Sequence, residues 1–287
     1  MKKRVAIVVF FCLGLAGCSG TTFLYNRLHI VLPWMLGSYV DLDREQKDYL
    51  KAELKPFLYW HRMEELPRYV QIIDQMEASL DEQVTPEEMA AIVRSFEEAW
   101  ARLEGRGLEL MMDLGERLSD EQMQDFLDSL DEQQAEYQEK YLERSDEEYY
   151  EDAYENFVDS AQDFMGRLSA EQKEAIRAGV GRLIRSDSIW VEERAAWNRR
   201  LADILDRDPG WQQEMRDAVA SRERDISPAY RETYLNNSAA LQETLADLLN
   251  SRSEAQDRKL RKTLDAYRDD FESLVEQGAD KPQPIAS

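Results

Sequence analysis

Apolar residues recur at helical spacing along most of the chain. After Thr85 the apolar positions are Met89, Ile92, Val93, Phe96, Trp100, Leu103, Leu110, Met111 and Leu114. After Ser169 they are Ile176, Val180, Leu183, Trp190, Trp197, Leu201 and Ile204. Residues three, four and seven apart lie on one face of an α-helix, so each run predicts a helix with an apolar side. Asp187 and Arg194 interrupt the second run, which predicts a break near Ser186.

Helix starts are marked by capping boxes, in which a short oxygen side chain stands three residues before Glu or Gln. The pattern occurs at residues 43–46, 85–88, 119–122 and 169–172. Asp208-Pro209 and Ser227-Pro228 carry the related signature of a cap followed by proline. No stretch alternates with period two for long enough to form a strand. We therefore predict an all-α protein of six to eight helices, packed as a multi-helix bundle or an elongated helical array.

The first eighteen residues carry a targeting signal. Three cations at positions 2–4 precede an apolar stretch, residues 5–15, that is too short to span a bilayer comfortably. The stretch ends in Leu15-Ala16-Gly17-Cys18, which resembles the lipobox of bacterial lipoproteins. The resemblance implies cleavage before Cys18 and acylation of its thiol, which anchors the protein to a membrane of a Gram-negative envelope. An uncleaved signal anchor or an ordinary secretory peptide is the alternative.

This interpretation divides the chain into four parts. We predict a removed signal peptide (1–17), a lipidated N-terminus with an apolar aromatic segment (18–40), a helical domain (41–277) and a disordered tail (278–287). Cys12 is then discarded and Cys18 is acylated, so no disulfide is expected. By resemblance to enterobacterial sorting rules, Ser19 after the cysteine favours the outer membrane over the inner one.

The apolar aromatic segment has two interpretations. Residues 23–36 hold ten apolar side chains and one cation, Arg27, and Pro33 disfavours a clean helix through the middle. The segment either lies against the bilayer beside the acyl chains or packs on the helical body as core. We favour packing as core, because an acylated lipoprotein does not require a second anchor.

The chain is strongly acidic, with 59 acidic and 36 basic residues and a net charge of −23. This charge argues against a nucleic-acid partner. The densest stretch, residues 120–163, has 17 acids and two cations, and Tyr137, Tyr141, Tyr149, Tyr150 and Tyr154 run through it at helical spacing. The tyrosines are a candidate interaction site for cationic protein segments. Loose binding of divalent cations is a second interpretation, and a solvated helix face with tyrosines at the core edge is a third, slightly favoured one.

Basic residues follow this acidic stretch. They are Arg167, Lys173, Arg177, Arg182, Arg185, Arg194, Arg199, Arg200 and Arg207. Like charges three or four residues apart destabilise a helix unless cations lie nearby. We therefore predict that the acidic segment and the basic helix after it are neighbours.

Few residues point to catalysis. Two histidines, His29 and His61, are too few for a His-rich zinc site, and the sequences HExxH and GxSxG, the P-loop and the EF-hand are absent, so we predict no catalytic residue, metal or cofactor. The densest polar cluster comprises Trp60, His61, Arg62, Glu64, Glu65 and Arg68. His61 and Glu65 share a helix face, an arrangement that can raise the pKa of the imidazole. The favoured alternative is a structural helix end, with Pro67 opening the next helix.

Two resemblances concern the family. Leu-Ser-x-Glu-Gln at 118–122 and 168–172 resembles the LTxxQ motif of Spy/CpxP-like periplasmic proteins, and 42–46 and 84–88 are looser copies. A broader resemblance is to a family of proteobacterial lipoproteins classed as a domain of unknown function. The segments that carry this resemblance are Tyr25-Asn26-Arg27-Leu28, Tyr39-Val40-Asp41-Leu42-Asp43-Arg44-Glu45-Gln46, Glu64-Glu65-Leu66-Pro67-Arg68-Tyr69 and Ser227-Pro228-Ala229-Tyr230-Arg231. His29 stands where members of that family often carry Asp.

From these observations we predict a non-enzymatic envelope lipoprotein with a protein-interaction or chaperone-like role. Its partners are the membrane, through lipid on Cys18, and an envelope protein. The alternatives are an enzyme acting on envelope polymers, with a site around His61 and nearby carboxylates, and a carrier of lipid or small molecules.

Overall fold

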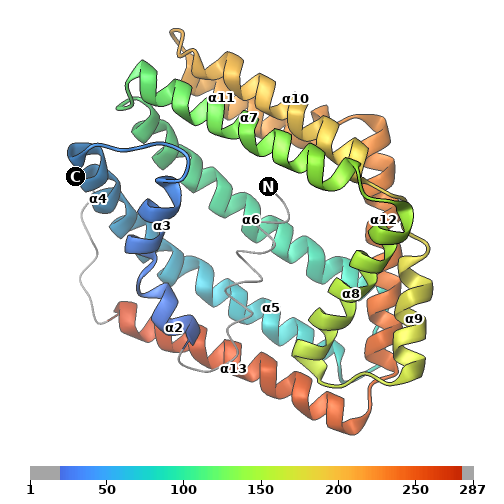
Figure 1. Cartoon of the computed structure of the whole chain (residues 1–287). Helices are drawn as coiled ribbons and strands as arrows, with labels where there is room; N and C mark the ends of the chain where they lie inside the picture. Colours follow the sequence, from blue (N-terminus) through green and yellow to red (C-terminus); the bar gives the residue numbers. More distant parts are fainter. Residues whose placement is uncertain (1–19, 280–287) are drawn as a thin grey trace.

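The computed structural model describes residues 20–279, and every regular element in that range is a helix (Figure 1). The elements are α2 (Gly20–Tyr25), α3 (Leu28–Leu36), α4 (Arg44–Trp60), η1 (His61–Glu65), α5 (Leu66–Ser79), α6 (Pro86–Gly115), α7 (Asp120–Leu142), α8 (Asp146–Met165), α9 (Ala170–Val180), α10 (Asp187–Leu205), α11 (Trp211–Asp225), α12 (Pro228–Asn250) and α13 (Glu254–Ala279). The predicted all-α fold is confirmed, but the chain breaks into more helices than the six to eight expected.

The helix starts follow the local sequence. Asp43, Thr85, Ser119 and Ser169 each cap a helix in a complete capping box, and Pro228 is the first residue of α12, as predicted. The break near Ser186 is also present, because α10 begins at the next residue.

Three features differ from the prediction. Pro33 does not interrupt its segment, since α3 runs from Leu28 to Leu36 through it. Asp208 does not cap α11, because its carbonyl accepts the Trp211 N–H in a tight turn and α11 begins only after Gly210, whose φ is 100°. The acidic stretch is two helices rather than one, because Ser145 opens a further capping box with Glu148 and thereby starts α8.

The helices surround α6, which crosses the molecule (Figure 1). On one side of it lie α4, α5 and α13, and along the opposite side lie α7, α10 and α11. At one end α8, α9 and α12 join the two sides, with α12 packed on both α6 and α9. The helix α6 therefore lies between the two sides and packs on α4, α5 and α12.

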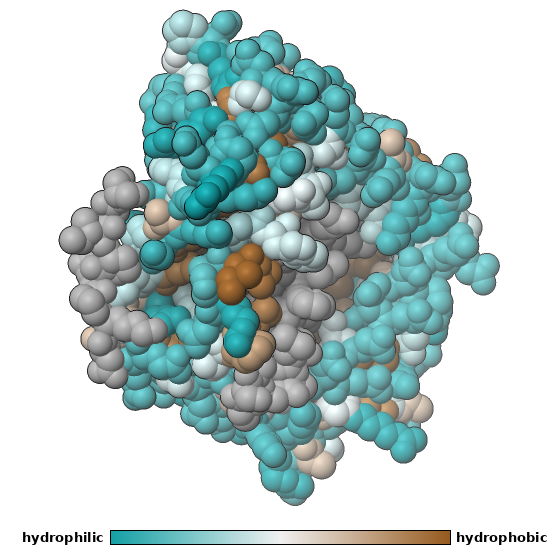
Figure 2. All heavy atoms as spheres, turned by 60° about the vertical axis from the view of Figure 1, so that its left-hand side comes forward, coloured by the Kyte–Doolittle hydropathy of each residue, from teal (hydrophilic) through white to brown (hydrophobic). Residues whose placement is uncertain are grey.

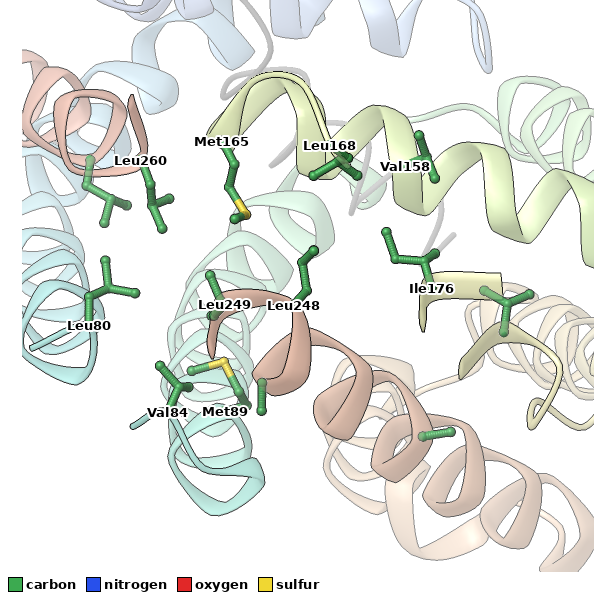
Figure 3. Packing of buried hydrophobic residues seen from close by; sticks show 14 of the residues in the cluster. Leu80, Val84, Met89, Val158, Met165, Leu168, Ile176, Leu248, Leu249 and Leu260 are labelled. Carbon is green, nitrogen blue, oxygen red and sulfur yellow. The ribbon is translucent and has the colours of Figure 1, made fainter. Parts of the chain in front are cut away.

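Most of the buried apolar side chains form three clusters, and α6 contributes to each. The largest joins α5, α6, α8, α9, α12 and α13, with Met89 from α6 close to Leu249 of α12 (Figure 3). A second joins α4 to the end of α6 at Leu114, and partly buried residues of α3 pack against it. A third joins α10 and α11 to α6 at Met112. Burying apolar surface on successive faces of one long helix holds the layers together.

Two capping boxes face each other at the starts of α4 and α7. Gln46 and Gln122 exchange amide hydrogen bonds, with an Nε2–Oε1 distance of 2.8 Å in each direction. The second amide hydrogen of each glutamine reaches a carbonyl two residues before the opposite cap. Gln46 donates to the Arg117 carbonyl and Gln122 to the Asp41 carbonyl, both at 2.7 Å. Each glutamine thus completes its own helix start and ties it to the other.

The same arrangement joins the starts of α9 and α13. Gln172 and Gln256 exchange amide hydrogen bonds at 3.0 and 2.9 Å and donate to the Ser251 and Arg167 carbonyls at 3.2 and 3.0 Å. We call these two arrangements the paired caps. In the boxes of Thr85 and Ser145 the third helical residue is glutamate, which has no hydrogen to donate when ionised and cannot pair in this way.

The predicted contact between acidic and basic segments is confirmed. The helix α7 packs on α10, and α8 packs on α9. Arg177 pairs with Glu151 at 2.8 Å, Arg185 with Asp146 at 2.6 Å, and Arg207 with Asp120. The basic residues do not all face the acidic helices, because Arg182 pairs with Glu243 of α12 and Arg200 with Asp225 of α11.

One close helix contact gives a direct test of the packing. A Cβ atom on Gly179 of α9 would lie 2.0 Å from Thr244 Oγ1 and 2.8 Å from Thr244 Cβ on α12, whereas Gly105 in α6 has open space around it. We expect Gly179→Ala to lower the free energy of unfolding by about 1–3 kcal/mol through overpacking. Gly105→Ala should raise it by about 0.5–1 kcal/mol, because alanine favours a helix interior. Urea denaturation measures both, and equal stabilities of the two variants would contradict the packing described.

Candidate functional site

The candidate site is built on a π-turn. The chain passes from α4 to α5 through η1, and the Leu66 N–H donates to the His61 carbonyl five residues earlier. Pro67 has no N–H, and in an α-helix its ring would clash with the carbonyl four residues before it. The wider turn carries the helix past this proline without a loop. Pro67 lies at the start of α5 as predicted, but in place of the expected helix end the helical backbone continues from α4 through η1 into α5.

A buried carboxylate closes this turn. Glu65 has no exposed surface. Its two oxygens accept the Arg102 Nε and Nη2 groups of α6 at 2.9–3.1 Å, and one of them also accepts Arg68 Nη1 at 2.9 Å. The Arg102 guanidinium has a raised pKa because of its hydrogen bonds to Glu65. Since an unpaired buried charge is costly, these two arginines make the buried carboxylate tolerable.

His61 joins two tyrosines of different helices. Its Nδ1 lies 2.9 Å from the hydroxyl of Tyr25 in α2, and its Nε2 lies 3.3 Å from the hydroxyl of Tyr69 in α5. A neutral imidazole donates from one nitrogen and accepts at the other, so one hydroxyl donates and the other accepts. His61 is therefore a bridge between the N-terminal segment and the body.

The pKa of His61 is lowered to about 4, chiefly by burial, which the nearby Glu65 charge only partly opposes. Glu65 acts in the expected direction, but the net shift is downward, because the loss of hydration around the imidazole outweighs the attraction of the carboxylate. Burial also raises the pKa of Tyr69 to about 12 and that of Tyr25 further. At neutral pH the bridge consists of three uncharged rings.

Further polar contacts fasten α2 to the body. Arg62 Nη2 donates to Asn26 Oδ1 at 2.7 Å, and Asn26 Nδ2 donates to Gln277 Oε1 of α13 at 3.1 Å. Thr22 donates to the buried Asp270 of α13 at 3.1 Å. We call the contacts of Thr22, Tyr25 and Asn26 with η1 and α13 the α2 clamp.

The close approach of α13 to η1 depends on a glycine. A Cβ atom on Gly278 would lie 2.6 Å from Arg62 Cδ and 2.7 Å from Met63 Sδ. Gly278 was predicted to lie in a disordered tail, but α13 continues two residues into that tail, to Ala279. The rest of the predicted tail lies outside the described residues.

The structure keeps the predicted polar cluster together but changes its composition. Trp60 donates to Glu64 at 3.2 Å, and the Arg106 guanidinium lies 4.9 Å from the Trp60 ring centroid, so these groups sit beside the bridge rather than in it. Tyr25, Asn26 and Arg102 belong to the site but were not among its predicted residues. The only sequence signal for the first two is the Tyr25-Asn26-Arg27-Leu28 pattern.

The tyrosines of the acidic segment lie between helices. Tyr137 and Tyr141 meet Trp190 of α10 edge to face, and the Tyr150 hydroxyl donates to the Leu183 carbonyl at 2.9 Å. Tyr149 is buried, and Tyr154 lies under the Arg177 guanidinium. These rings therefore contact the protein's own helices, as in the interpretation that places them at the core edge.

The polar groups of this arrangement bond to one another across several helices. Every buried side-chain nitrogen and oxygen within residues 20–279 has a hydrogen-bond partner, and no group of three His, Cys, Asp or Glu there is placed to hold a metal. An open depression lined by Arg224, Ile226, Arg231 and Leu235, among others, lies at the start of α12, away from the cluster. Cys18 and the predicted signal peptide lie outside the described part of the chain.

Comparison with known proteins gives a family without an assigned activity. The model of a family of unknown function, DUF6279, matches residues 38–231. The chain belongs to this family. No curated protein and no solved structure shows significant similarity to it. None of the helices from residue 20 to residue 279 is long and apolar enough to cross a membrane.

The lowered pKa of His61 predicts a pH dependence of stability. Below about pH 6.5 the unfolded chain binds a proton at this histidine that the folded protein does not bind until about pH 4. The folded state therefore loses stability as the pH falls. We expect the wild type to lose about 2 kcal/mol more than His61→Gln between pH 7 and pH 5. Urea denaturation at both pH values measures this, with exposed His29→Gln as the control for removing an imidazole. Equal losses in wild type and His61→Gln would contradict the assignment.

Proposed function

We propose that this protein is a bacterial envelope lipoprotein that holds an acidic helical body beside the membrane and binds a protein partner there. The proposal keeps the lipobox interpretation of Leu15-Ala16-Gly17-Cys18. The observation that carries it is the α2 clamp, whose first contact, at Thr22, comes four residues after Cys18.

A lipid tether alone needs no fixed contact between its end and the body. Here Thr22, Tyr25 and Asn26 are bonded to η1 and α13. Four extended residues reach at most about 14 Å, so lipid on Cys18 would keep these contacts close to the bilayer. The clamp would then restrict how the body is oriented on the membrane, which matters for a protein that must meet a partner.

The chemistry of the site supports a role in binding rather than catalysis. His61 and Glu65, the groups with the most unusual environments, hold α2, α5 and α6 together. The exposed acids of α7 and α8 and the net charge of −23 would attract a cationic partner. The likeness of residues 118–122 and 168–172 to the LTxxQ motif of Spy/CpxP-like proteins supports an adaptor or chaperone-like role in the periplasm. A proteobacterial origin and the outer membrane as location are part of the proposal.

The first experiment separates anchoring from binding. We expect the wild type, made in a Gram-negative host, to fractionate with membranes and Cys18→Ala to be released. A photoreactive residue at Glu139 or Glu155, both exposed on the acidic helices, should then trap a protein in living cells. The matched control is the same probe at Glu272, an exposed acid on α13. The binding should weaken in isolated envelopes as salt rises, because exposed charges are screened beyond about 3 Å at 1 M.

Each outcome has a defined meaning. One dominant adduct supports an adaptor, and a heterogeneous ladder that grows under envelope stress supports a chaperone-like holder. No adduct from Glu139 and Glu155, or the same adducts from Glu272, would contradict binding through the acidic helices. Unchanged fractionation of Cys18→Ala would contradict the lipid anchor.

A further inference from the structure

The α2–α3 segment has one face on the body and one face open. On the inner face Tyr25 and Asn26 belong to the α2 clamp, and Leu32 and Leu36 pack against the second core cluster. On the outer face lie Phe23, Ile30 and Trp34, which are 58%, 59% and 79% exposed, and α3 has no fully buried residue. Figure 2, turned to bring this side of the molecule forward, shows apolar surface among mainly hydrophilic atoms. The interpretation of the segment as core therefore describes only its inner face.

The outer face forms a stripe with a single charge. Ile30 and Trp34, four residues apart, share one face of α3, and Phe23 of α2 stands before the turn that holds Arg27. The Arg27 guanidinium lies 3.3 Å from the centroid of the Phe23 ring. Residues 19–40 contain no acid, although the chain has 59. A hydrophobic stripe with tryptophan and one cation is typical of a surface that meets the interfacial layer of a membrane.

We propose that Phe23, Ile30 and Trp34 insert into the interfacial layer of the lipid bilayer, beside the acylated Cys18. This inference rests on the lipid anchor of the proposed function. The length of chain identifies the bilayer as the occupant, because Phe23 follows Cys18 by five residues and lies within about 18 Å of it when the chain is extended. The nine residues of α3 span about 13 Å, so the helix lies along the surface of a membrane whose apolar core is about 30 Å thick.

Charge favours the same face. A body with a net charge of −23 is repelled by anionic headgroups, so the acid-free stripe is the part that approaches them at the lowest cost. Arg27 at the centre of the stripe adds an attraction to anionic lipid. Together with the α2 clamp, insertion would fix both the height and the tilt of the helical body above the bilayer.

The test uses two apolar sites of equal exposure. Ile30→Cys and Leu235→Cys replace side chains that are 59% and 60% exposed, on α3 and on α12. The full sequence has two cysteines, of which Cys12 is removed with the signal peptide and Cys18 is acylated. The mature chain then has no free thiol, so an environment-sensitive fluorophore attaches only at the new cysteine. The full-length lipidated variants are reconstituted in vesicles of phosphatidylethanolamine and phosphatidylglycerol. Mass spectrometry first establishes acylation of Cys18, and urea denaturation establishes that both variants fold.

We expect the fluorophore at position 30 to shift to the blue, to be quenched by nitroxide-labelled lipid and to lose most of its quenching by aqueous acrylamide. The fluorophore at position 235 should stay accessible to acrylamide. Acylated protein in which both positions respond alike overturns the insertion and leaves the anchor intact. A blue shift at position 30 that grows with protein concentration in detergent, without vesicles, overturns it in favour of a second copy of the chain. Protein that is not acylated at Cys18 contradicts the proposed function and this inference with it.

Discussion

The fold depends on how the starts of distant helices are joined in pairs. The first amides of a helix have no partner within it, so a helix start needs groups supplied by other residues. The paired caps meet this need for four helices with four glutamines, three of which are buried. The oxygen of each glutamine amide accepts the cap N–H of its own helix and an amide hydrogen of the partner glutamine. Its own two hydrogens bond to the partner glutamine oxygen and to a backbone carbonyl before the opposite helix. Helix starts that are 76 and 84 residues apart in the chain are thereby held together.

The π-turn adds a second constraint near the N-terminus. The Glu65 carboxylate has no exposed surface, and the Arg102 guanidinium of α6 forms its main ion pair. The turn presents His61 and Arg62 to α2 and leaves room for Gly278 of α13. The segment that follows the proposed lipid attachment is therefore held by residues of the π-turn itself. In this account the site is a joint between the anchor and the body.

The local sequence predicted much of the fold and less of the site. Capping boxes at Asp43, Thr85, Ser119 and Ser169 set helix starts correctly, because a cap is a contact between residues three apart. The glutamine pairing escaped prediction, since it joins boxes distant in the sequence. Arg102 was missed for the same reason, 37 residues from Glu65. The direction of the His61 pKa shift came out wrong because spacing reveals a neighbouring charge but not the loss of water around the ring.

The most direct test of the paired caps changes one atom. Gln172→Glu keeps the size of a side chain that is 4% exposed but replaces the NH₂ group that donates to the Ser251 carbonyl and to Gln256. The free energy of unfolding should fall by about 2–4 kcal/mol, because two acceptors lose their donor and a carboxylate is buried beside them. The reverse change, Glu88→Gln in an exposed box, should alter it by less than about 0.5 kcal/mol. Equal effects of the two substitutions in urea denaturation would contradict the claim that the glutamine pairs hold the fold together.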